Sequence, residues 1–278
     1  MLRQCFARVC RKAALPPEAL DYVLSGDLLN QCVGSAYAMR GVGAPYLGLY
    51  GACSTMAEAV SLAAMLIDGG CAETAAALTS SHFCSAERQY RFPLEYGGQR
   101  TPTAQWTVTG SGAVILQSGG AGPYITYLTP GRIVDAGITD ANNMGAAMAP
   151  AAFDTVLAVF DDTGFGPDDF DGIFSGDLGR LGSEILRDLC RERGIELGQR
   201  YSDCGEMIFS SDQECYSGGS GAGCSACVLN SFLLGKMHEH EYNRILLVAT
   251  GALMSPTTSF QGESIPAICH GIILENDL

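Results

Sequence analysis

The chain has 278 residues, 47% of them hydrophobic and 17% charged, so it can bury a large core and is not intrinsically disordered. Its 16 basic and 30 acidic residues give a net charge of −14, which argues against a nucleic-acid partner and against unaided attraction to an anionic membrane. Twelve cysteines without an apolar leader indicate a reducing compartment, and we therefore expect a cytoplasmic protein.

The first predicted element is an amphipathic helix, in which Leu2, Phe6, Val9 and Ala13 share one face. A short apolar strand at residues 22–28 follows and contains Ser-Gly-Asp near its end. Residues 51–55, Gly-Ala-Cys-Ser-Thr, then open a second helix. Strands are predicted next at residues 74–78 and 111–117.

The second half of the chain repeats these elements in the same order. A strand at 172–178 again contains Ser-Gly-Asp, and Gly-Ala-Gly-Cys-Ser at 221–225 again opens a helix. Strands at 244–248 and 270–275 complete the match. Strands that alternate with helices at this spacing predict right-handed βαβ units. We expect a duplicated α/β fold with mainly parallel or mixed sheets, divided into halves at 1–124 and 125–278.

The strongest candidate site is the strand-to-helix turn that contains Cys53. The positive end of a helix favours a thiolate, so this turn suits a nucleophile. It equally suits an anion held by free backbone N–H groups, and a cysteine there is often inert packing. The second turn, at Cys224, favours a designed site, because two turns related by a pseudo-dyad would face one another.

Cysteine catalysis also needs a base, and four histidines are present. His82 follows a predicted strand at the sheet end where α/β proteins bind ligands, and His270 precedes the last strand. Either could reach Cys53, or each could be a structural histidine with its hydrogen bonds satisfied. His238 and His240 are expected in a solvated helix end.

The segment from residue 88 to residue 106 is long and rich in arginine, tyrosine and proline, and it contains the only tryptophan. Long ordered loops are often functional. Arginines at 88, 91 and 100 offer forked donors to carboxylates, and the rings of residues 90, 96 and 106 offer flat faces to a ligand. The alternative is a loop that packs at a dimer interface.

Several runs of residues resemble one family across most of the chain. They lie at 25–31, 51–55, 90–99, 102–110, 143–151 and 249–256, and they resemble the stage V sporulation protein AD family. That family is similar in fold to thiolases and ketoacyl synthases, so the resemblance implies two halves in a layered α-β-α-β-α arrangement. It also implies a homodimer that binds dipicolinic acid (pyridine-2,6-dicarboxylic acid) and acts in its uptake into the developing endospore.

The same resemblance implies a location at the periphery of the spore inner membrane, reached through the other stage V sporulation protein A membrane proteins. Relatives also carry an upstream segment with the first strand of the N-terminal sheet. Residue 1 of this chain falls in the helix that follows that strand. We therefore expect an interior strand of the sheet to be missing.

The resemblance places Cys53 where condensing enzymes keep their nucleophile. Their second half supplies a histidine where this chain has residues 175–179, and an asparagine or histidine turn where it has 221–225. Both partners are missing, and without a base and an oxyanion donor most of the rate enhancement is lost. We therefore expect a protein that is not an enzyme.

The first hypothesis is a non-catalytic binding protein for dipicolinate, with no metal or cofactor other than calcium that accompanies the ligand. The residues expected to line its cleft are Asp27, Asn30, Cys53, Ser54, His82, Gln105, Asp177 and Cys224. The second hypothesis is a thiolase-like acyltransferase that uses Cys53 with His82 or His270. The third is a scaffold of a membrane channel complex with no ligand of its own.

Overall fold

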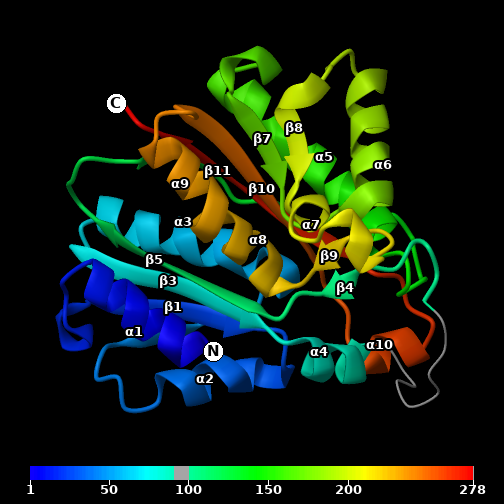
Figure 1. Ribbon diagram of the computed structural model, residues 1–278. Helices are drawn as coiled ribbons and strands as arrows, with labels where there is room; N and C mark the ends of the chain where they lie inside the picture. The colour runs from blue at the N-terminus through cyan, green and yellow to red at the C-terminus, as the bar shows by residue number, and fades with distance from the viewer. Residues whose placement is uncertain (91–99, 278) are drawn as a thin grey trace.

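The computed structural model describes residues 1–90 and 100–277, which form two sheets and three layers of helices (Figure 1). The N-terminal sheet contains, in spatial order, β2 (Tyr46–Gly48), β1 (Tyr22–Asp27), β3 (Thr74–Ser81) and β5 (Gly110–Gln117). The first three strands are parallel, and β5 runs antiparallel to β3.

The C-terminal sheet contains β6 (Tyr124–Thr129), β11 (Ala267–Glu275), β10 (Arg244–Ala252), β7 (Gly172–Ser175) and β8 (Tyr201–Asp203). Here β10, β7 and β8 are parallel, whereas β11 is antiparallel to both of its neighbours. A two-stranded parallel ladder of β4 (Trp106–Thr107) and β9 (Gly219–Ser220) joins the two halves.

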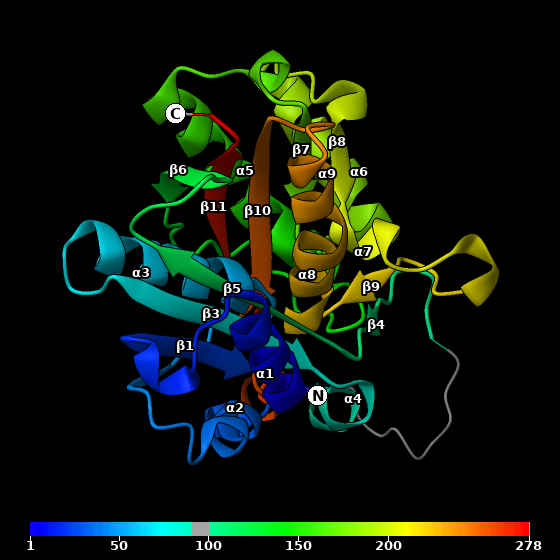
Figure 2. The same ribbon diagram turned by 60° about the vertical axis from the view of Figure 1, so that its left-hand side comes forward.

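Helices cover the outer face of each sheet and fill the space between them (Figures 1 and 2). Helices α1 (Leu2–Lys12) and α2 (Val33–Met39) cover the N-terminal sheet, and α5 (Met144–Thr163) and α6 (Gly179–Glu192) cover the C-terminal one. The middle layer holds α3 (Thr55–Asp68) and α8 (Ala222–Val228), which continues through a π-helical turn (Leu229–Leu233) into α9 (Leu234–His238). The predicted α-β-α-β-α order is confirmed.

Shorter helices lie at the ends of strands. They are α4 (Phe83–Tyr90), α7 (Cys204–Met207) and α10 (Pro256–Phe260). Single 3-10 turns occur at Pro17–Ala19, Asn30–Cys32, Ala52–Ser54, Pro167–Asp169, Gly198–Arg200 and Ser211–Gln213. Among the described helices, α5 is by length and composition apolar enough to cross a membrane, but more than half of its most apolar window is buried, as in the core helix of a globular protein.

The duplication that the repeats predict is visible in the hydrogen bonds. The Oδ2 atom of Asp21 accepts hydrogen bonds from the backbone N–H groups of Glu73 and Thr74 at 2.8 and 2.9 Å. The Oδ2 atom of Asp171 does the same for Asn243 and Arg244, at 2.6 and 3.0 Å. The strand registers agree, since β1 pairs with β3 in the register in which β7 pairs with β10. The two halves therefore repeat one pattern of strand pairing.

The expectation that the missing strand of the N-terminal sheet is an interior one is wrong. The strand β6 is the element of the second half without a counterpart among the described strands of the first, and it lies at the edge of its sheet beside β11. The equivalent place in the N-terminal sheet is beside β5, at the edge and not in the interior. The β1–β3 pairing at the centre of that sheet is therefore uninterrupted.

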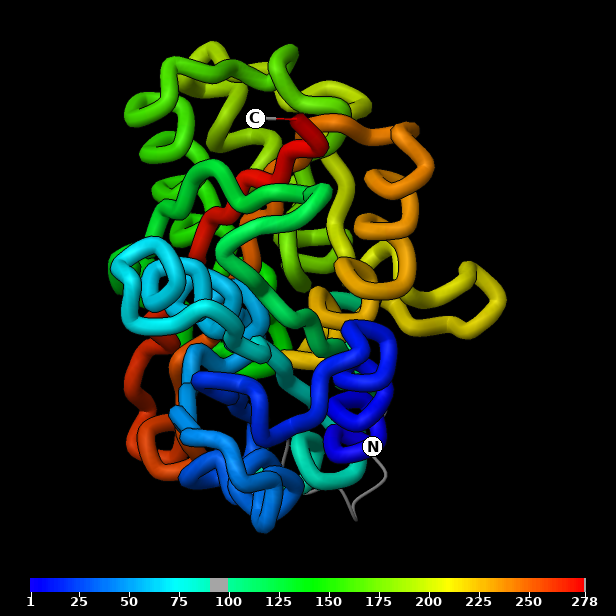
Figure 3. The backbone as a smooth tube through the Cα atoms, turned by 90° about the vertical axis from the view of Figure 1, so that its left-hand side faces the viewer, coloured from blue at the N-terminus to red at the C-terminus, as the bar shows by residue number. Residues whose placement is uncertain are grey.

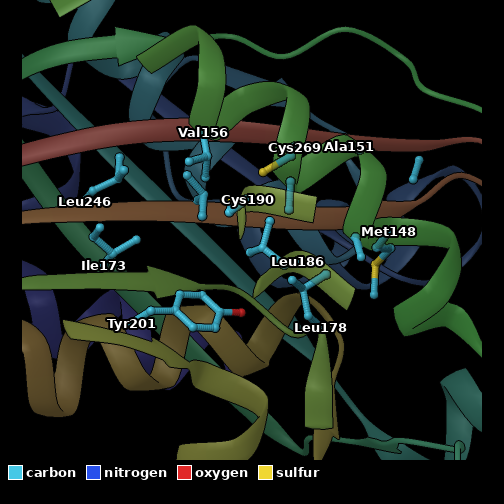
Figure 4. Packing of buried hydrophobic residues seen from close by; sticks show 14 of the residues in the cluster. Met148, Ala151, Val156, Ile173, Leu178, Leu186, Cys190, Tyr201, Leu246 and Cys269 are labelled. Carbon is cyan, nitrogen blue, oxygen red and sulfur yellow. The ribbon is translucent and has the colours of Figure 1, made fainter. Parts of the chain in front are cut away.

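The largest core cluster lies between the C-terminal sheet and its outer helices. Figure 4 shows Val156 of α5 on the side of Leu246, and Met148, two turns earlier in the same helix, on the side of Leu178. A second cluster fills the middle layer, where Met56 and Val60 of α3 are buried. In α1 the buried residues are Leu2, Phe6 and Cys10, so the predicted amphipathic helix is confirmed, with Cys10 in place of Ala13.

Candidate functional site

Cys53 lies in the 3-10 turn that leads into α3, where the two halves meet. Ala52 before it has the left-handed φ of +52°, which turns the chain sharply into the helix. The turn is held by the Ser54 hydroxyl, which donates to the Gly51 carbonyl oxygen at 2.7 Å. The Cys53 Sγ atom points across the interface and lies 3.8 Å from the Ser220 Oγ atom of β9.

The equivalent turn of the second half contacts this one, and its hydrogen bonds pair residues 51–55 with 221–225 position by position, so the two cysteines are not equivalent. The Gly51 oxygen accepts from the Ser54 N–H at 3.0 Å, and the Gly221 oxygen accepts from the Cys224 N–H at 2.8 Å. Cys224 is therefore the counterpart of Ser54, and the counterpart of Cys53 is a glycine, Gly223. The Cys224 side chain is fully buried in the middle-layer core and does not reach the cleft.

A buried carboxylate lies beside Cys53. Asp177 accepts hydrogen bonds from the Ser220 hydroxyl (3.0 Å), the Gly221 N–H (3.0 Å) and the Thr250 hydroxyl (2.9 Å). Burial raises the pKa of the Cys53 thiol well above its usual value, and the Asp177 charge raises it further. Burial likewise raises the pKa of Asp177. Cys53 is therefore held as a neutral thiol at the pH where a nucleophile would have to be a thiolate.

Cys53 opens into a cavity of about 30 Å³ between the halves, which has room for about two waters. Among the described residues that line it, none is basic and none is histidine. They are Leu28, Tyr50, Ala52, Cys53, Ala86, Tyr90, Thr107, Met144, Ser220, Ala252 and Met254.

Two tyrosines close this cavity. The hydroxyl oxygens of Tyr50 and Tyr90 are 2.8 Å apart, and the Tyr90 hydroxyl donates to the Leu28 carbonyl oxygen at 2.8 Å. Tyr50 is 40% exposed, so its ring forms the outer wall. A ligand larger than two waters enters only when these rings move.

The structure places both predicted bases away from this cavity. His82 precedes α4 and lines a separate groove of about 240 Å³ together with Asp27. The Nδ1 atom of His270, on β11, accepts from the Gly131 N–H at 3.2 Å, and burial lowers the pKa of His270. His270 is therefore a neutral structural histidine, and neither side chain lines the wall beside Cys53.

Two other predicted ligand residues are engaged in internal hydrogen bonds. The carboxylate of Asp27 accepts from the Leu29 N–H at 2.8 Å and from the N–H and hydroxyl of Ser35 at 2.6 Å each. The Asn30 side-chain oxygen accepts from the Gln89 amide at 2.8 Å. Asp27 thereby fixes the start of α2, and Asn30 fixes α4 against the end of β1.

Gln105 lies inside the protein behind the cavity. Its amide nitrogen donates to the carbonyl oxygens of Asp177 and Gly219 (3.0 Å for the latter), so it ties β9 to the end of β7. Of the eight predicted ligand residues, Cys53 lines the cavity directly and Asp177 lies behind it. The structure therefore places the aspartate of the second Ser-Gly-Asp beside Cys53, whereas the aspartate of the first, Asp27, is bonded to Ser35 of α2.

The segment from 88 to 106 contributes one wall of the cavity, Tyr90, and the arginine of a structural ion pair. Arg100 pairs with the buried Glu87 at 2.6 Å, and its guanidinium lies 4.1 Å from the centre of the Trp106 ring. Arg100 is thus held by the protein itself and is not a donor to a ligand. The predicted roles of Arg91 and Tyr96 lie outside the described residues. Sequence reasoning missed Ser220, whose only signal is its place before the second glycine turn.

The two duplicated sheets, with a cysteine at the start of the middle-layer helix, give the chain a thiolase-like fold. AbyA1, a tetronic acid condensing enzyme, has this fold with a TM-score of 0.64 and 18% identity over 99% of this chain and 84% of that chain. The 3-oxoacyl-[acyl-carrier-protein] synthase III of Aquifex aeolicus VF5 has a TM-score of 0.58 and 16% identity over 99% and 83%. These similarities concern the fold alone.

Comparison with known sequences gives the particular family. The family model of stage V sporulation protein AD (SpoVAD) matches residues 1–275. The stage V sporulation protein AD of Bacillus subtilis (strain 168) is 47% identical over 265 residues, which are 95% of this chain and 78% of that protein. The chain belongs to the stage V sporulation protein AD family, and the predicted resemblance is confirmed.

Proposed function

We propose that this sporulation protein binds dipicolinate in its thiolase-like cleft and does not transfer acyl groups. The observation that argues against acyl transfer is the Asp177 carboxylate beside Cys53. It lies in residues 175–179, where the resemblance to condensing enzymes implies a histidine. A carboxylate there opposes the thiolate that would attack a thioester, and the described cavity wall supplies no histidine to remove the thiol proton. The described lining of the cleft therefore lacks a group that would take the Cys53 proton, and acylation requires this proton transfer.

The ligand follows from the family resemblance, and the cavity's charge favours one form of it. Dipicolinate is a dianion, whereas the described lining contains no basic side chain and the nearest buried acid is Asp177. The calcium chelate carries its own neutralising charge, so we propose that calcium dipicolinate is the form taken up. Tyr50 and Tyr90 would rotate outward and offer their faces to the pyridine ring.

Calorimetry with purified protein tests this proposal. Dipicolinate with calcium is expected to bind, and benzene-1,3-dicarboxylate with calcium, which has the same outline but lacks the chelating ring nitrogen, is expected to give no heat. Replacing the buried Ala86 of the cavity wall with leucine should fill the pocket and abolish binding. Gly235→Ala, at a helix position with open space around it, is the control and should bind as the wild type does.

Two results would contradict the proposal. Absence of heat with dipicolinate, with and without calcium, would favour the scaffold without a ligand. Release of coenzyme A from an acyl thioester in repeated turnovers, lost in Cys53→Ala, would favour the acyltransferase.

We also propose a homodimer that lies at the spore inner membrane with the other stage V sporulation protein A proteins. The edge strand β2 supports the dimer, because its Leu47 is 41% exposed and its outer side has no partner strand among the described residues. Sedimentation equilibrium of the wild type and of Leu47→Glu tests this: the wild type should sediment as a dimer and the variant as a monomer. A monomeric wild type would exclude the dimer.

A further inference from the structure

The outer face of the N-terminal half carries a positive charge that the overall composition hides. Helix α1 contains four basic residues and no acidic one: Arg3, Arg8, Arg11 and Lys12, all exposed. Leu2, Phe6 and Cys10 on the opposite side of the helix are buried against the sheet. The figures show α1 and α2 side by side at the end of the molecule away from the C-terminal sheet (Figures 2 and 3).

We propose that this face of α1 and α2 docks onto a lipid bilayer that contains anionic lipids. Helix α2 contains no acidic residue and ends before Arg40. Tyr37 is 65% exposed, and the Arg40 guanidinium lies 5.3 Å from the centre of its ring. Val33, one turn earlier, is 41% exposed. Basic side chains next to exposed aromatic and apolar ones are the composition of surfaces that lie at a membrane interface.

The duplication supplies an internal comparison for this charge. By the repeat, α5 and α6 hold the places of α1 and α2 on the C-terminal sheet (Figure 1). Helices α1 and α2 together have four basic and no acidic residues, a net charge of +4. Helices α5 and α6 have three basic and six acidic residues, a net charge of −3. Because both pairs cover a sheet of the same kind, the fold does not require the positive charge of the first pair.

The net charge of −14 does not prevent this docking. At physiological ionic strength, charges more than about 8 Å apart are largely screened, so a membrane responds to the face that approaches it. The described elements that α1 packs against, namely α2, β3 and β5, contain no acidic residue. Two acidic side chains lie next to these helices: Glu18 borders the end of α1 beside Cys10, and Asp27, which is buried, accepts hydrogen bonds from Ser35 of α2.

An anionic bilayer fits these observations better than the other acidic partners. A nucleic acid would follow a longer track of basic groups and would be repelled by the acidic remainder of the chain. An acidic protein would match the charge as well, and protein-free vesicles separate it from a bilayer, whose interface accommodates exposed Val33 and Tyr37. The face thus presents charge to the headgroups and apolar groups to the level just below them.

Co-sedimentation with vesicles tests the proposal. Wild-type protein should bind vesicles of phosphatidylglycerol and phosphatidylcholine, bind weakly to phosphatidylcholine alone, and be released as the salt concentration rises. Arg8→Glu/Arg11→Glu on α1 should weaken binding at least about tenfold, since each basic residue near an anionic surface contributes about a factor of five. Arg191→Glu/Arg193→Glu makes the same change in net charge on the other outer face and should bind as the wild type does.

Circular dichroism of all variants establishes that they are folded. The proposal is overturned if wild-type protein fails to bind anionic vesicles at low salt. It is also overturned if both double variants lose binding equally, or if binding occurs only to vesicles that carry other membrane proteins. Tyr37→Ala supplies a second variant, which should weaken binding at high salt, where the charge contribution is screened.

Discussion

Replacing Asp177 with asparagine should make the Cys53 thiol more reactive. The Asp177 carboxylate lies beside the thiol, and both groups are buried, so its charge opposes the thiolate through little solvent. Two unit charges about 4 Å apart interact by about 4 kcal/mol at an effective dielectric constant of about 20. Removal of the full interaction would raise the thiolate population about a thousandfold, since about 1.4 kcal/mol corresponds to a factor of ten.

The expected effect is smaller, because burial raises the pKa of Asp177 and part of the population is already neutral. Burial of the thiol is also unchanged in the variant, and it remains the main cause of the raised pKa of Cys53. We therefore expect Asp177→Asn to increase the rate of Cys53 alkylation by iodoacetamide about tenfold to a hundredfold. Mass spectrometry of the peptide that contains Cys53 measures the rate, with the exposed Cys71 and Cys84 as internal references.

A matched control separates charge from local loosening. Thr250→Val removes a hydrogen bond to the same carboxylate but keeps its charge, and Thr250 is fully buried. This variant should lose about 1–3 kcal/mol of stability without a faster alkylation of Cys53. If Thr250→Val accelerates alkylation as much as Asp177→Asn does, or if Asp177→Asn leaves the rate unchanged, the carboxylate does not suppress the thiolate.

Gly251→Ala should lower the free energy of unfolding by about 2 kcal/mol, because the added Cβ would overlap the Gly51 carbonyl oxygen where the halves meet. Gly235→Ala, in open space on α9, should instead raise it by about 0.5–1 kcal/mol, and urea titrations followed by tryptophan fluorescence measure both. Equal stabilities would contradict the close contact. Burial raises the pKa of Asp203 to about 7. The folded state therefore holds a proton that the unfolded chain releases near pH 4, and the free energy of unfolding should fall as the pH rises from about 4 to about 7. Asp203→Asn should flatten this dependence in urea titrations at several pH values, and an unchanged slope would exclude Asp203 as its source.

The fold could be predicted from the sequence because the internal repeat shows the same order of strands and helices in both halves. The Ser-Gly-Asp motifs end equivalent strands, and the apolar runs between them have the lengths of buried strands. Duplicated order then leaves few topologies, since connections between parallel strands are right-handed. The structure extends several strands beyond their predicted ends, such as β10, which runs to Ala252.

The cleft could be predicted only in part. The small residues of the second glycine turn permit two alignments with the first, and hydrogen bonds of the folded chain decide that Gly223, and not Cys224, matches Cys53. The sequence places His82 near a strand end but does not say to which side it points. The size of the cavity depends on Tyr50 and Tyr90, which meet across forty residues of sequence.

The opposite charges of the two outer helical faces could not be predicted from the sequence for a different reason. A net charge sums over the whole surface, and only the packing of α1 and α2 on one face shows that their basic residues are separated from the acidic helices of the other half. The periodicity of apolar residues along a helix predicts which of its faces is exposed. It does not predict which other helices lie on the same face of the molecule.

The ladder between β4 and β9 limits how the molecule can move. The Trp106 N–H donates to the Gly218 oxygen and the Val108 N–H donates to the Ser220 oxygen, each at 2.8 Å, so hydrogen bonds join a strand of each half along one wall of the cavity. The two halves cannot separate on this side without breaking the hydrogen bonds between β4 and β9. Exchange of the amide protons of Trp106 and Val108 with solvent would therefore report directly whether the two halves ever separate.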